Sequence, residues 1–442
     1  MMRSAFRAQA PTPLWTLTQR SFSTSTVLRR INKICTSEND AIQKVKSGST
    51  VLVGGFGFSG VPESLIEAVA ARKDLKDLTV VSNNAGMPGV GLVQTGELPV
   101  RYNRDGSVAL MSRPRETREF HGKKYVLEEA IFADVALVKV HKADRLGNCT
   151  FRKAQNNFNE AMAKNAKLTI VEADEIVEVG QLDPESVHIQ GIYVDVIIQS
   201  TRPKKIEKLT FAQDAKREGK VTSTNQRRER IIKRASKELK DGMYVNLGIG
   251  MPLATPGMLP DDLEVILQSE NGILGMGRYP NPGEEDPDLI NPGKETVTLN
   301  PGASTFGSHE SFGMIRAGKI DLTMLGALQV SQYGDLANFM LPGKVKGIGG
   351  AMDLVASPEK TKVIITMEHV DRNGNPKILE ECTFPLTGPR CVSRIITDLA
   401  VFDCTPEGLV LRELVDEVEM DELKSKTGAS FRIADDLIPY QT

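Results

Sequence analysis

The chain has 442 residues, 40 % of them hydrophobic and 25 % charged, which is the composition of a globular protein with two or three domains. Its formal net charge of -2 gives no electrostatic reason to expect nucleic acid or an anionic membrane as the main partner. The cysteines include no Cys-x-x-Cys pair and the histidines lie far apart, so neither a disulfide framework nor a metal site is predicted, and no apolar run has the length of a membrane span.

The first 33 residues are basic, contain no acidic residue and are rich in serine and threonine. Their basic side chains are those of Arg3, Arg7, Arg20, Arg29, Arg30 and Lys33. This composition is typical of a mitochondrial transit peptide, so residues 1–33 are predicted to be such a peptide and to lie outside the fold. A disordered basic tail is the alternative that the same composition allows.

A strand, a glycine-rich loop and a helix follow one another early in the remaining chain. Thr50–Val53 is predicted to be a buried strand and Glu63–Ala71 a helix. Three glycines of the loop have the G-x-G-x-x-G spacing of a dinucleotide-binding loop: Gly55, Gly57 and Gly60. In a dinucleotide-binding fold the next strand should end in an acidic residue. Because Leu78–Val81 is followed by Ser82 and Asn83 instead, nicotinamide binding is disfavoured.

The same order of strand, glycine turn and proline recurs in the segment Asp241–Pro252. It is followed by a second apolar run, Leu263–Leu267, which ends in the polar turn 269–272. Two similar α/β units are therefore predicted. Alignment of the two turns places Asn83 of the first unit opposite Glu270 of the second, so only the second unit has a carboxylate there.

Glu270 is predicted to lie at the carboxyl end of a buried parallel strand. In open α/β sheets ligands bind outside these strand ends, and a glycine two residues later would allow a substrate to approach. A carboxylate in this position is a candidate nucleophile or base. The alternative is a solvated loop glutamate, and the difference from Asn83 favours the catalytic interpretation.

The other predicted elements fill the two units. Strands are predicted at Ile131–Val140, Leu168–Val171, Tyr193–Ile198, Thr323–Leu328, Val363–Met367, Ile395–Val401 and Leu409–Leu411. Helices are predicted at Asn39–Val45, Asn156–Ala166, Met420–Lys426 and from an N-cap near Ser223 to Leu239. Between the units, Thr201–Thr224 is rich in Lys and Arg and is predicted to be a solvated linker rather than a docking patch.

Two segments carry a resemblance to a known family. Leu267–Gly272 resembles the L-[HQ]-S-E-N-G signature of family I CoA-transferases and matches it in full. The glycine-rich segment Val51–Pro62 is similar to the other signature of this family, with a departure at Ser47, where Asp or Asn is usual. From Cys35 to the C-terminus the chain looks like the fused two-domain form that acts on succinyl-CoA and 3-oxo acids.

The resemblance implies an α/β fold in which two similar open α/β CoA-transferase domains are fused in one chain. It places an N-terminal domain at residues 35–200, a linker at 201–224, and a C-terminal domain with the catalytic glutamate at 225–442. A homodimer is expected, without a nucleic-acid or membrane partner.

The activity that the resemblance implies is transfer of CoA from succinyl-CoA to a 3-oxo acid such as acetoacetate, in ketone-body breakdown in the mitochondrial matrix. Glu270 would attack the acyl-CoA to form a mixed anhydride and then a glutamyl-CoA thioester, which gives ping-pong kinetics without a metal or other cofactor. A glutamate with an ordinary pKa of about 4.3 would be ionised there without a partner base.

The resemblance also implies roles for further residues. The backbone N–H of Gly350 would stabilise an oxyanion, and Asn246 and Asn83 would line the site as amide donors. Turn formation is the alternative reason for both asparagines. CoA and substrate contacts would come from Gly54, Gly55, Gly57, Gly60, Gly248, Gly250, Asn271, Gly272 and Gly349.

One part of the family pattern is absent. After the Asn-Asn-Ala-Gly turn, relatives have several dozen residues that include a Pro-Gln-Gly-Thr motif, whose glutamine lines the active site. Here Gly86 is followed almost directly by the family-like segment that begins at Tyr102, so the N-terminal domain is expected to be internally truncated near residues 86–102. A CoA-transferase homologue without catalytic activity, and an incomplete gene model lacking activity, are the alternatives that this leaves open.

Overall fold

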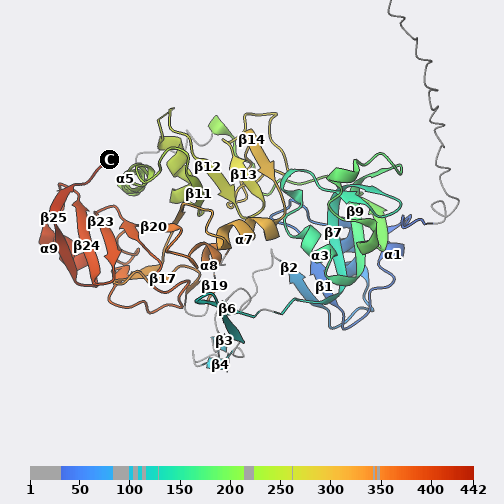
Figure 1. Cartoon of the computed structure of the whole chain (residues 1–442), viewed down its shortest axis with the longest axis horizontal. Helices are drawn as coiled ribbons and strands as arrows, with labels where there is room; N and C mark the ends of the chain where they lie inside the picture. Colours follow the sequence, from blue (N-terminus) through green and yellow to red (C-terminus); the bar gives the residue numbers. More distant parts are fainter. Residues whose placement is uncertain are drawn as a thin grey trace, which may run out of the picture. The chain divides into compact units, whose positions relative to one another are not determined.

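The computed structural model describes residues 31–82, 99–102, 108–111, 116–127, 129–213, 223–260, 262–341, 344–345 and 349–442 (Figure 1). Most of the predicted transit peptide, and Asn83, lie outside these ranges. Among the helices of the described ranges, none is long and apolar enough to cross a membrane.

The first α/β unit contains a sheet of six strands. Five of them are parallel, in the order β10-β9-β7-β1-β2, and β8 pairs antiparallel with β7. The strands are β1 (Thr50–Val53), β2 (Thr79–Ser82), β7 (Ala133–Asp144), β8 (Cys149–Thr150), β9 (Ala166–Val177) and β10 (Val196–Gln199). Helices of this unit are α1 (Glu38–Ala41), α2 (Glu63–Ala71) and α3 (Asn159–Ala163), with 3-10 turns η2 (Lys153–Gln155), η3 (Pro184–Ser186) and η4 (Gly191–Tyr193).

The second α/β unit contains a ten-stranded sheet with the order β14-β13-β12-β11-β15-β20-β22-β23-β24-β25. Its strands are β11 (Tyr244–Leu247), β12 (Ile266–Ser269), β13 (Ile273–Met276), β14 (Leu299–Thr305), β15 (Leu322–Leu325), β20 (Lys362–Thr366), β22 (Arg394–Ile396), β23 (Ala400–Thr405), β24 (Gly408–Leu414) and β25 (Phe431–Pro439). Helices of this unit are α5 (Ser223–Ser236), α6 (Met251–Ala254), α7 (Ser308–Arg316), α8 (Ala351–Leu354) and α9 (Met420–Lys426), with the 3-10 turn η5 (Thr255–Met258).

The two sheets repeat one topology. The parallel order β2-β1-β7-β9-β10 of the first sheet recurs as β12-β11-β15-β20-β22 in the second. The register agrees as well: Val51 of β1 pairs with Val80 of β2, and Val245 of β11 pairs with Leu267 of β12. The prediction of two similar α/β units is therefore confirmed. The second sheet continues beyond β12 with the antiparallel strands β13 and β14, whereas β2 ends the first sheet within the described residues.

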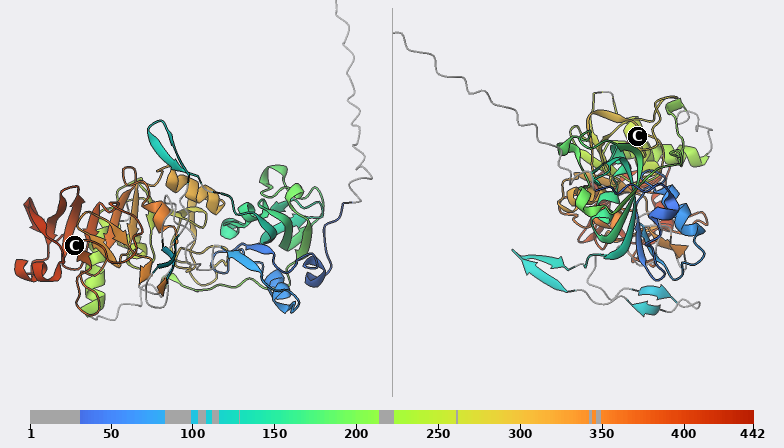
Figure 2. Two further views of the ribbon diagram at one scale, coloured as in Figure 1. Left: turned by 90° about the horizontal axis from the view of Figure 1, so that it is seen from below. Right: turned by 90° about the vertical axis from the view of Figure 1, so that its right-hand side faces the viewer.

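Several short strands form small sheets of their own. Figure 2 shows the hairpins β3–β4 and β5–β6 as separate two-stranded ribbons, which join neither large sheet. These strands are β3 (Pro99–Tyr102), β4 (Val108–Met111), β5 (Thr117–Phe120) and β6 (Lys123–Val126). In the second unit β16 (Gln329–Ser331) pairs with β17 (Leu336–Ala337) and β21 (Ile378–Leu379), and β18 (Met340–Leu341) pairs with β19 (Lys344–Val345).

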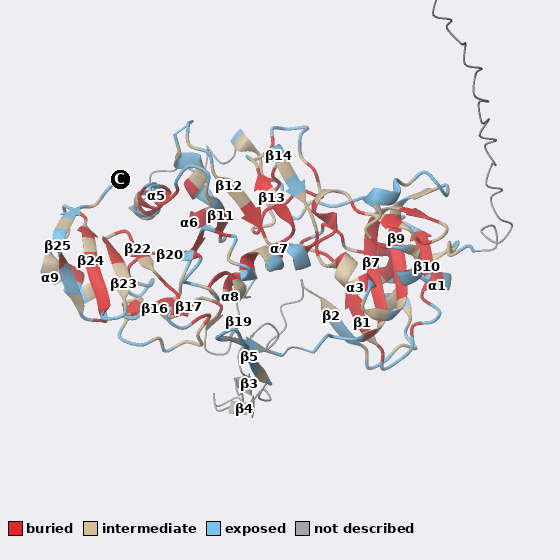
Figure 3. Ribbon diagram, viewed as in Figure 1, coloured by how far each residue is buried: buried red, intermediate tan, exposed pale blue. Residues whose placement is uncertain are grey.

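The central strands of both sheets are buried on both faces (Figure 3). In β1, Val51 and Val53 belong to one apolar cluster, with Leu65 of α2, while Leu52 belongs to the cluster on the other face. Successive side chains of a strand point to opposite faces, so a parallel strand covered on both faces is apolar throughout. This explains why the continuous apolar run Thr50–Val53 predicts its strand with the correct limits.

Several predicted elements, such as Tyr193–Ile198 and Asn39–Val45, differ from the structure in their limits, and two are interrupted by a turn or loop. Ile395–Val401 is not one strand, because β22 and β23 run antiparallel and the residues between them form a turn. The helix predicted at Asn156–Ala166 is reduced to α3, since Asn157 has a positive φ of +32° and belongs to a loop. A periodic apolar pattern cannot reveal a turn whose geometry is fixed by distant partners.

Residues 201–213, which we call the connecting segment, are mostly exposed, as a solvated linker would be. Their lysines nevertheless pair with carboxylates of both units. Lys204 lies 2.7 Å from Asp174 in β9 and also pairs with Asp288 of the second unit, and Lys208 pairs with Glu295. The segment is thus held against both units by ion pairs that its composition did not indicate.

Candidate active site

Glu270 lies in the turn between β12 and β13, directly after the last residue of β12. Because β12 runs parallel to β11, this is the carboxyl edge at which the sequence predicts it. Gly272 of the same turn has a φ of +96°, and a Cβ atom there would lie 1.9 Å from the carbonyl oxygen of Phe306. The turn therefore requires glycine for its own backbone packing, whatever contact Gly272 makes with a substrate.

Buried hydrogen bonds fix the end of β12. Asn246 Nδ2 donates to Gln268 Oε1 at 2.6 Å, and Gln268 Nε2 donates to Ser311 Oγ at 2.6 Å. Ser311 Oγ in turn donates to the carbonyl oxygen of Ser269 at 3.0 Å. These side chains are almost completely buried, and a buried polar network of this kind restricts the positions of its members. Asn246, predicted as an amide donor to substrate, thus also supports the strand that carries Glu270.

Gly349 and Gly350 lie directly against Glu270. A Cβ atom on Gly350 would be 3.7 Å from Glu270 Cβ and 3.4 Å from Cε1 of Phe312, and one on Gly349 would be 3.9 Å from Glu270 Oε1. Gly350 is the N-terminal cap of α8. The structure therefore brings together the predicted nucleophile and the two glycines to which the family resemblance assigns an oxyanion and a substrate contact.

The charge of Glu270 is disfavoured by its surroundings. Burial raises the pKa of the Glu270 carboxyl, while its own backbone N–H, the positive charge of Lys294 and a hydrogen bond with Asn246 act to lower it. The expectation of an ordinary pKa for Glu270 is therefore wrong. Its pKa is raised, because the end of the strand shields the carboxyl from solvent. A carboxylate that is hard to ionise is a stronger nucleophile once it is ionised.

Lys294 is a residue of the site that sequence reasoning did not single out. Burial lowers the pKa of its ammonium group, and the negative charges of Glu207 and Glu270 raise it. Its nitrogen lies 3.4 Å from the centroid of the Phe56 ring, in the glycine loop of the first unit. The only sequence signal is that Lys294 lies in the part of the chain, from Cys35 onward, that resembles the family, and the resemblance assigns it no role.

The glycines of the first loop are crowded by protein atoms. A Cβ atom on Gly54 would lie 2.0 Å from Asn159 Oδ1, one on Gly55 would lie 2.5 Å from Val61 Cγ2, and one on Gly60 would lie 2.4 Å from the carbonyl oxygen of Gln155. Packing within the first unit is therefore a sufficient reason for glycine at these three positions. Gly57 differs, because its neighbours Glu207, Ile290 and Lys294 are outside the first unit.

Asn157 links the two loops. Its Oδ1 accepts a hydrogen bond from the backbone N–H of Gly55 at 3.1 Å, and its Nδ2 donates to the carbonyl oxygen of Ser59 at 3.2 Å. Its carbonyl oxygen accepts from the N–H of Ser308, at the start of α7, at 2.6 Å. The segment just before Ser308 contains Phe306, whose N–H donates to Gly272 at 3.0 Å. The glycine loop and the Glu270 turn are thus connected through one short backbone segment.

The remaining predicted site residues are less closely associated with Glu270. The N–H of Gly248 donates to the carbonyl oxygen of Met324 at 2.8 Å, and Gly250 caps the short helix α6 in an exposed position. Asn271 is buried, and its Nδ2 donates to the carbonyl oxygen of Ile290 at 2.8 Å, so it ties the turn to the protein. Asn83 lies outside the described residues, directly after the end of β2.

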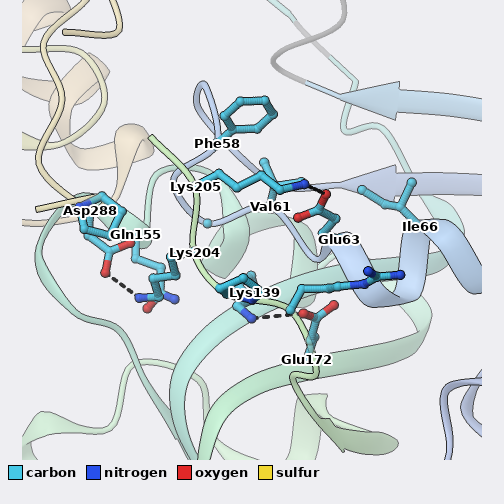
Figure 4. Close-up of a pocket in the computed structure, with 14 residues that line it drawn as sticks. Phe58, Val61, Glu63, Ile66, Lys139, Gln155, Glu172, Lys204, Lys205 and Asp288 are labelled. Atoms are coloured by element: carbon cyan, nitrogen blue, oxygen red, sulfur yellow. Dashed lines mark hydrogen bonds and ion pairs between the residues drawn. The ribbon is translucent and has the colours of Figure 1, made fainter. Parts of the chain in front are cut away.

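A cavity of about 220 Å³ lies beside the glycine loop, and Glu270 is not among its lining residues (Figure 4). Its charged side chains pair with one another: Lys139 with Glu172 at 2.9 Å, Lys204 with Asp288, and Lys205 with Glu63. Because its charges are already neutralised, this cavity is a weaker candidate for the chemistry than the surroundings of Glu270. Within the described ranges no group of His, Cys, Asp or Glu side chains is arranged to hold a metal ion.

Comparison with known proteins identifies the family. The family model described as coenzyme A transferase matches residues 36–97, 96–200 and 228–426, which is most of the chain. The chain belongs to the coenzyme A transferase family. The match of this transferase to the model is broken within its first half, where one matched range ends at residue 97 and the next begins at residue 96.

Several relatives of this transferase have similar sequences. It is 44 % identical to succinyl-CoA:3-ketoacid coenzyme A transferase 2, mitochondrial, of Homo sapiens over 490 residues, which cover 96 % of this chain and 94 % of that protein. It is also 44 % identical to succinyl-CoA:3-ketoacid coenzyme A transferase 2A, mitochondrial, of Rattus norvegicus over 477 residues, which cover 92 % of this chain and 91 % of that protein. Both alignments are longer than the 442 residues of this chain, so several dozen of their positions have no residue here.

Solved structures show the same fold. The acyl-CoA transferase (YdiF) apoenzyme of Escherichia coli O157:H7 superposes on this transferase with a TM-score of 0.70 at 18 % identity, over 93 % of this chain and 96 % of that chain. A thioester complex of the same enzyme with CoA gives a TM-score of 0.67. The predicted α/β fold with two repeated domains is confirmed.

Proposed function

We propose that this coenzyme A transferase moves CoA from succinyl-CoA to a 3-oxo acid such as acetoacetate, through a thioester on Glu270. The observation that carries the proposal is a carboxylate at the carboxyl end of β12 with Gly349 and Gly350 packed against it. The names of relatives that align over nearly the whole chain support the choice of substrates.

The reaction would begin with attack of a Glu270 carboxylate oxygen on the thioester carbonyl carbon of succinyl-CoA. The CoA thiolate leaves and a mixed anhydride remains. The thiolate then attacks the Glu270 carbonyl carbon, succinate departs, and a glutamyl-CoA thioester is formed. The acceptor acid reverses both steps and leaves as its CoA thioester. No metal or redox cofactor is needed for any of these steps.

Each attack creates a negatively charged oxygen that requires a hydrogen-bond donor. We assign this role to the backbone N–H of Gly350, since a glycine there leaves room for the reacting atoms beside Glu270. Asn246 would act on the carboxylate itself, through its hydrogen bond with Glu270 and through the Gln268 network that holds the strand end. Asn83 would supply an amide from the first unit.

The thioester can be tested directly. After incubation with succinyl-CoA without acceptor, the peptide that contains Glu270 should gain the mass of a CoA adduct, and acetoacetate should remove it. Glu270→Ala should abolish both the adduct and CoA exchange, with a loss of at least about 10³-fold in rate because the nucleophile is gone. Exchange at the unmodified rate in Glu270→Ala would refute the proposal.

A second candidate is a folded CoA-binding homologue without transfer activity. Two observations favour it. Several dozen positions of the alignments with the relatives have no residue in this chain, and the family match is broken near residues 96–97. A folded chain that binds CoA but forms no adduct on Glu270 would support this second function. Sequencing of the transcript across Gly86–Tyr102 would decide whether the truncation near residues 86–102 belongs to the protein.

We also propose that the protein acts in the mitochondrial matrix as a homodimer. The basic leader composition of residues 1–33 and the mitochondrial names of the relatives support this location. N-terminal sequencing of protein isolated from mitochondria would locate a cleavage site near residue 33, and sedimentation equilibrium would give the number of chains in the assembly. A full-length chain in the cytosol would contradict the proposed location. A monomeric mass would contradict the proposed homodimer.

A further inference from the structure

Helix α7 connects the first unit to the candidate active site. Its first residue, Ser308, donates its backbone N–H to the carbonyl oxygen of Asn157 in the first unit at 2.6 Å. One turn later, the ring of Phe312 packs on the ring of Phe158, the next residue of the first unit, with the ring centroids 6.0 Å apart. The beginning of α7 is therefore held by two residues of the first unit that are adjacent in the sequence.

The same helix holds α8, whose N-terminal cap is Gly350. A Cβ atom on Gly350 would lie 3.4 Å from Phe312 Cε1 and 3.7 Å from Glu270 Cβ, so the ring and the nucleophile border the same space beside this glycine. One turn further along α7, Arg316 Nε donates to Asp353 Oδ1 of α8 at 2.7 Å. Residues four apart lie on one face of a helix, so one face of α7 fixes α8 at both of its ends.

A third contact of α7 is with the strand end that carries Glu270. Ser311 Oγ accepts from Gln268 Nε2 at 2.6 Å and donates to the carbonyl oxygen of Ser269 at 3.0 Å. Through neighbouring residues, α7 thus contacts both the strand of the nucleophile and the cap that would supply the oxyanion donor. A displacement of about 1 Å between such groups can cost about 10²-fold in rate. The helix is therefore in a position to set their spacing.

We propose that Phe312 is a positioning residue for the backbone N–H of Gly350, and that Phe158 of the first unit sets the position of Phe312. The proposal rests on the transfer through Glu270 given above. Helix α7 then couples the docking of residues 155–159 of the first unit to the alignment of the oxyanion donor with the nucleophile. Because a phenyl ring supplies neither a charge nor a strong hydrogen bond, its effect should be on the rate of attack and not on the affinity for the CoA ester.

The kinetic test compares Phe312→Leu with Phe431→Leu. Phe431 is the matched control, because both phenylalanines are partly buried against the same apolar cluster of the second unit and each belongs to an aromatic pair, that of Phe431 with Phe402 at 5.3 Å. Phe312→Leu should lower the rate of CoA-adduct formation on Glu270, at saturating succinyl-CoA, at least about tenfold. Loss of an oxyanion donor costs about 10²–10³-fold, and a misaligned donor loses part of that.

The succinyl-CoA concentration that gives half the maximal rate should stay unchanged in Phe312→Leu, and Phe431→Leu should change neither quantity. A merely structural phenylalanine would not separate the two. An equal loss of rate in Phe431→Leu, or a change confined to the half-saturating concentration, would refute the positioning role of Phe312.

Phe158→Leu tests the part of the proposal that concerns the first unit. It should lower the same rate, and in a double-mutant cycle with Phe312→Leu the effects on the logarithm of the rate should be non-additive, because each change removes one ring of the same pair. Additive effects would show that Phe158 does not act through Phe312.

Amide hydrogen exchange tests the coupling without turnover. The N–H groups of Leu354 and Val355 donate to the carbonyl oxygens of Gly350 and Ala351 at 3.0 and 3.1 Å. Phe158→Leu should speed exchange of these two amides several-fold in the full chain, although Phe158 belongs to the first unit, whereas the Phe431→Leu control should not. Unchanged exchange in Phe158→Leu would refute the proposal. Faster exchange in Phe158→Leu, together with no CoA adduct in the unmodified chain, would refute the proposed function alone.

Discussion

Glu270 is a carboxylate held where its charge is costly. Burial raises its pKa, and the groups that lower it again are Lys294, Asn246 and its own backbone N–H. In the unfolded chain the same carboxyl would have a pKa of about 4.3. At neutral pH an ionised Glu270 therefore destabilises the folded protein.

Replacement of Glu270 by Gln should stabilise the protein at neutral pH. The folded-state pKa lies above the unfolded-state value, so ionisation of Glu270 destabilises the folded state once the pH exceeds the unfolded pKa, and Gln removes this term. The gain should shrink as the pH falls below about 4, where the carboxyl is protonated in both states. Urea unfolding of both proteins from about pH 4, near the reference pKa of about 4.3, to about pH 8 measures this gain in stability. A less stable Glu270→Gln variant at neutral pH would contradict the raised pKa.

Gly272→Ala should destabilise the protein by about 2 kcal/mol or more. Alanine here would have to adopt a backbone conformation with positive φ, which is unfavourable for a residue with a side chain. Its Cβ atom would also lie 1.9 Å from the Phe306 carbonyl oxygen, so the backbone must move. Gly374→Ala is the matched control, because Gly374 has a φ of +85° but no atom within 4 Å of the added Cβ. It should cost only about 1 kcal/mol in urea unfolding. Equal losses for the two variants would show that contact with Phe306 is unimportant.

At the scale of elements, the two units share no strand among the described residues and are connected by side-chain ion pairs as well as by backbone hydrogen bonds. Arg152, just before η2 of the first unit, donates from Nη1 to Asp286 Oδ1 at 2.7 Å and to Asp288 Oδ2 at 3.0 Å in the second unit. Lys204 of the connecting segment joins Asp174 to Asp288. Composition predicts a charged linker here, but which carboxylates its lysines meet depends on how both units fold.

Arg152→Leu should weaken this connection by about 1–3 kcal/mol, a range reduced for the partial exposure of the arginine. Burial alone would raise the pKa of Asp286, but hydrogen bonds from Arg152 and Lys153 outweigh burial and lower it. The stabilisation that Arg152 and Asp286 provide should therefore be present above the unfolded-state pKa of about 3.9. It should be lost as the pH falls from there through the lower pKa of the folded state. Unfolding of both proteins as a function of pH measures this loss.

The control for Arg152→Leu is Arg278→Leu, because Arg278 and its partner Glu284 are both exposed. This change should leave the free energy of unfolding nearly unaltered, because solvent screens an exposed ion pair. A similar small effect for Arg152→Leu would show that the pair with Asp286 contributes nothing beyond a surface ion pair.

At the scale of the whole molecule, one topology is used twice, and Glu270, the proposed nucleophile, lies in the second copy. The second sheet has β13 and β14 beside β12, and the turn between β12 and β13 holds Glu270. In the first unit the corresponding chain after Ser82 lies outside the described residues, in the region where the family match is broken. The unit that carries Glu270 contains its own supporting network, and the described residues of the first unit reach it at Phe56, on which Lys294 lies, and at Asn157, which accepts from Ser308.

The sequence by itself determined the local features: the strand Thr50–Val53, the helix Glu63–Ala71, the repeat of the two units, the family signature and the position of Glu270 at a strand end. These follow from apolar periodicity and from short motifs, which depend on neighbours in the chain. Only the tertiary structure decided that Glu270 is partly buried, that Lys294 lies on Phe56, and that Asn157 joins the two loops. These contacts join residues far apart in the sequence, and their energies depend on distance and burial, which no local pattern encodes.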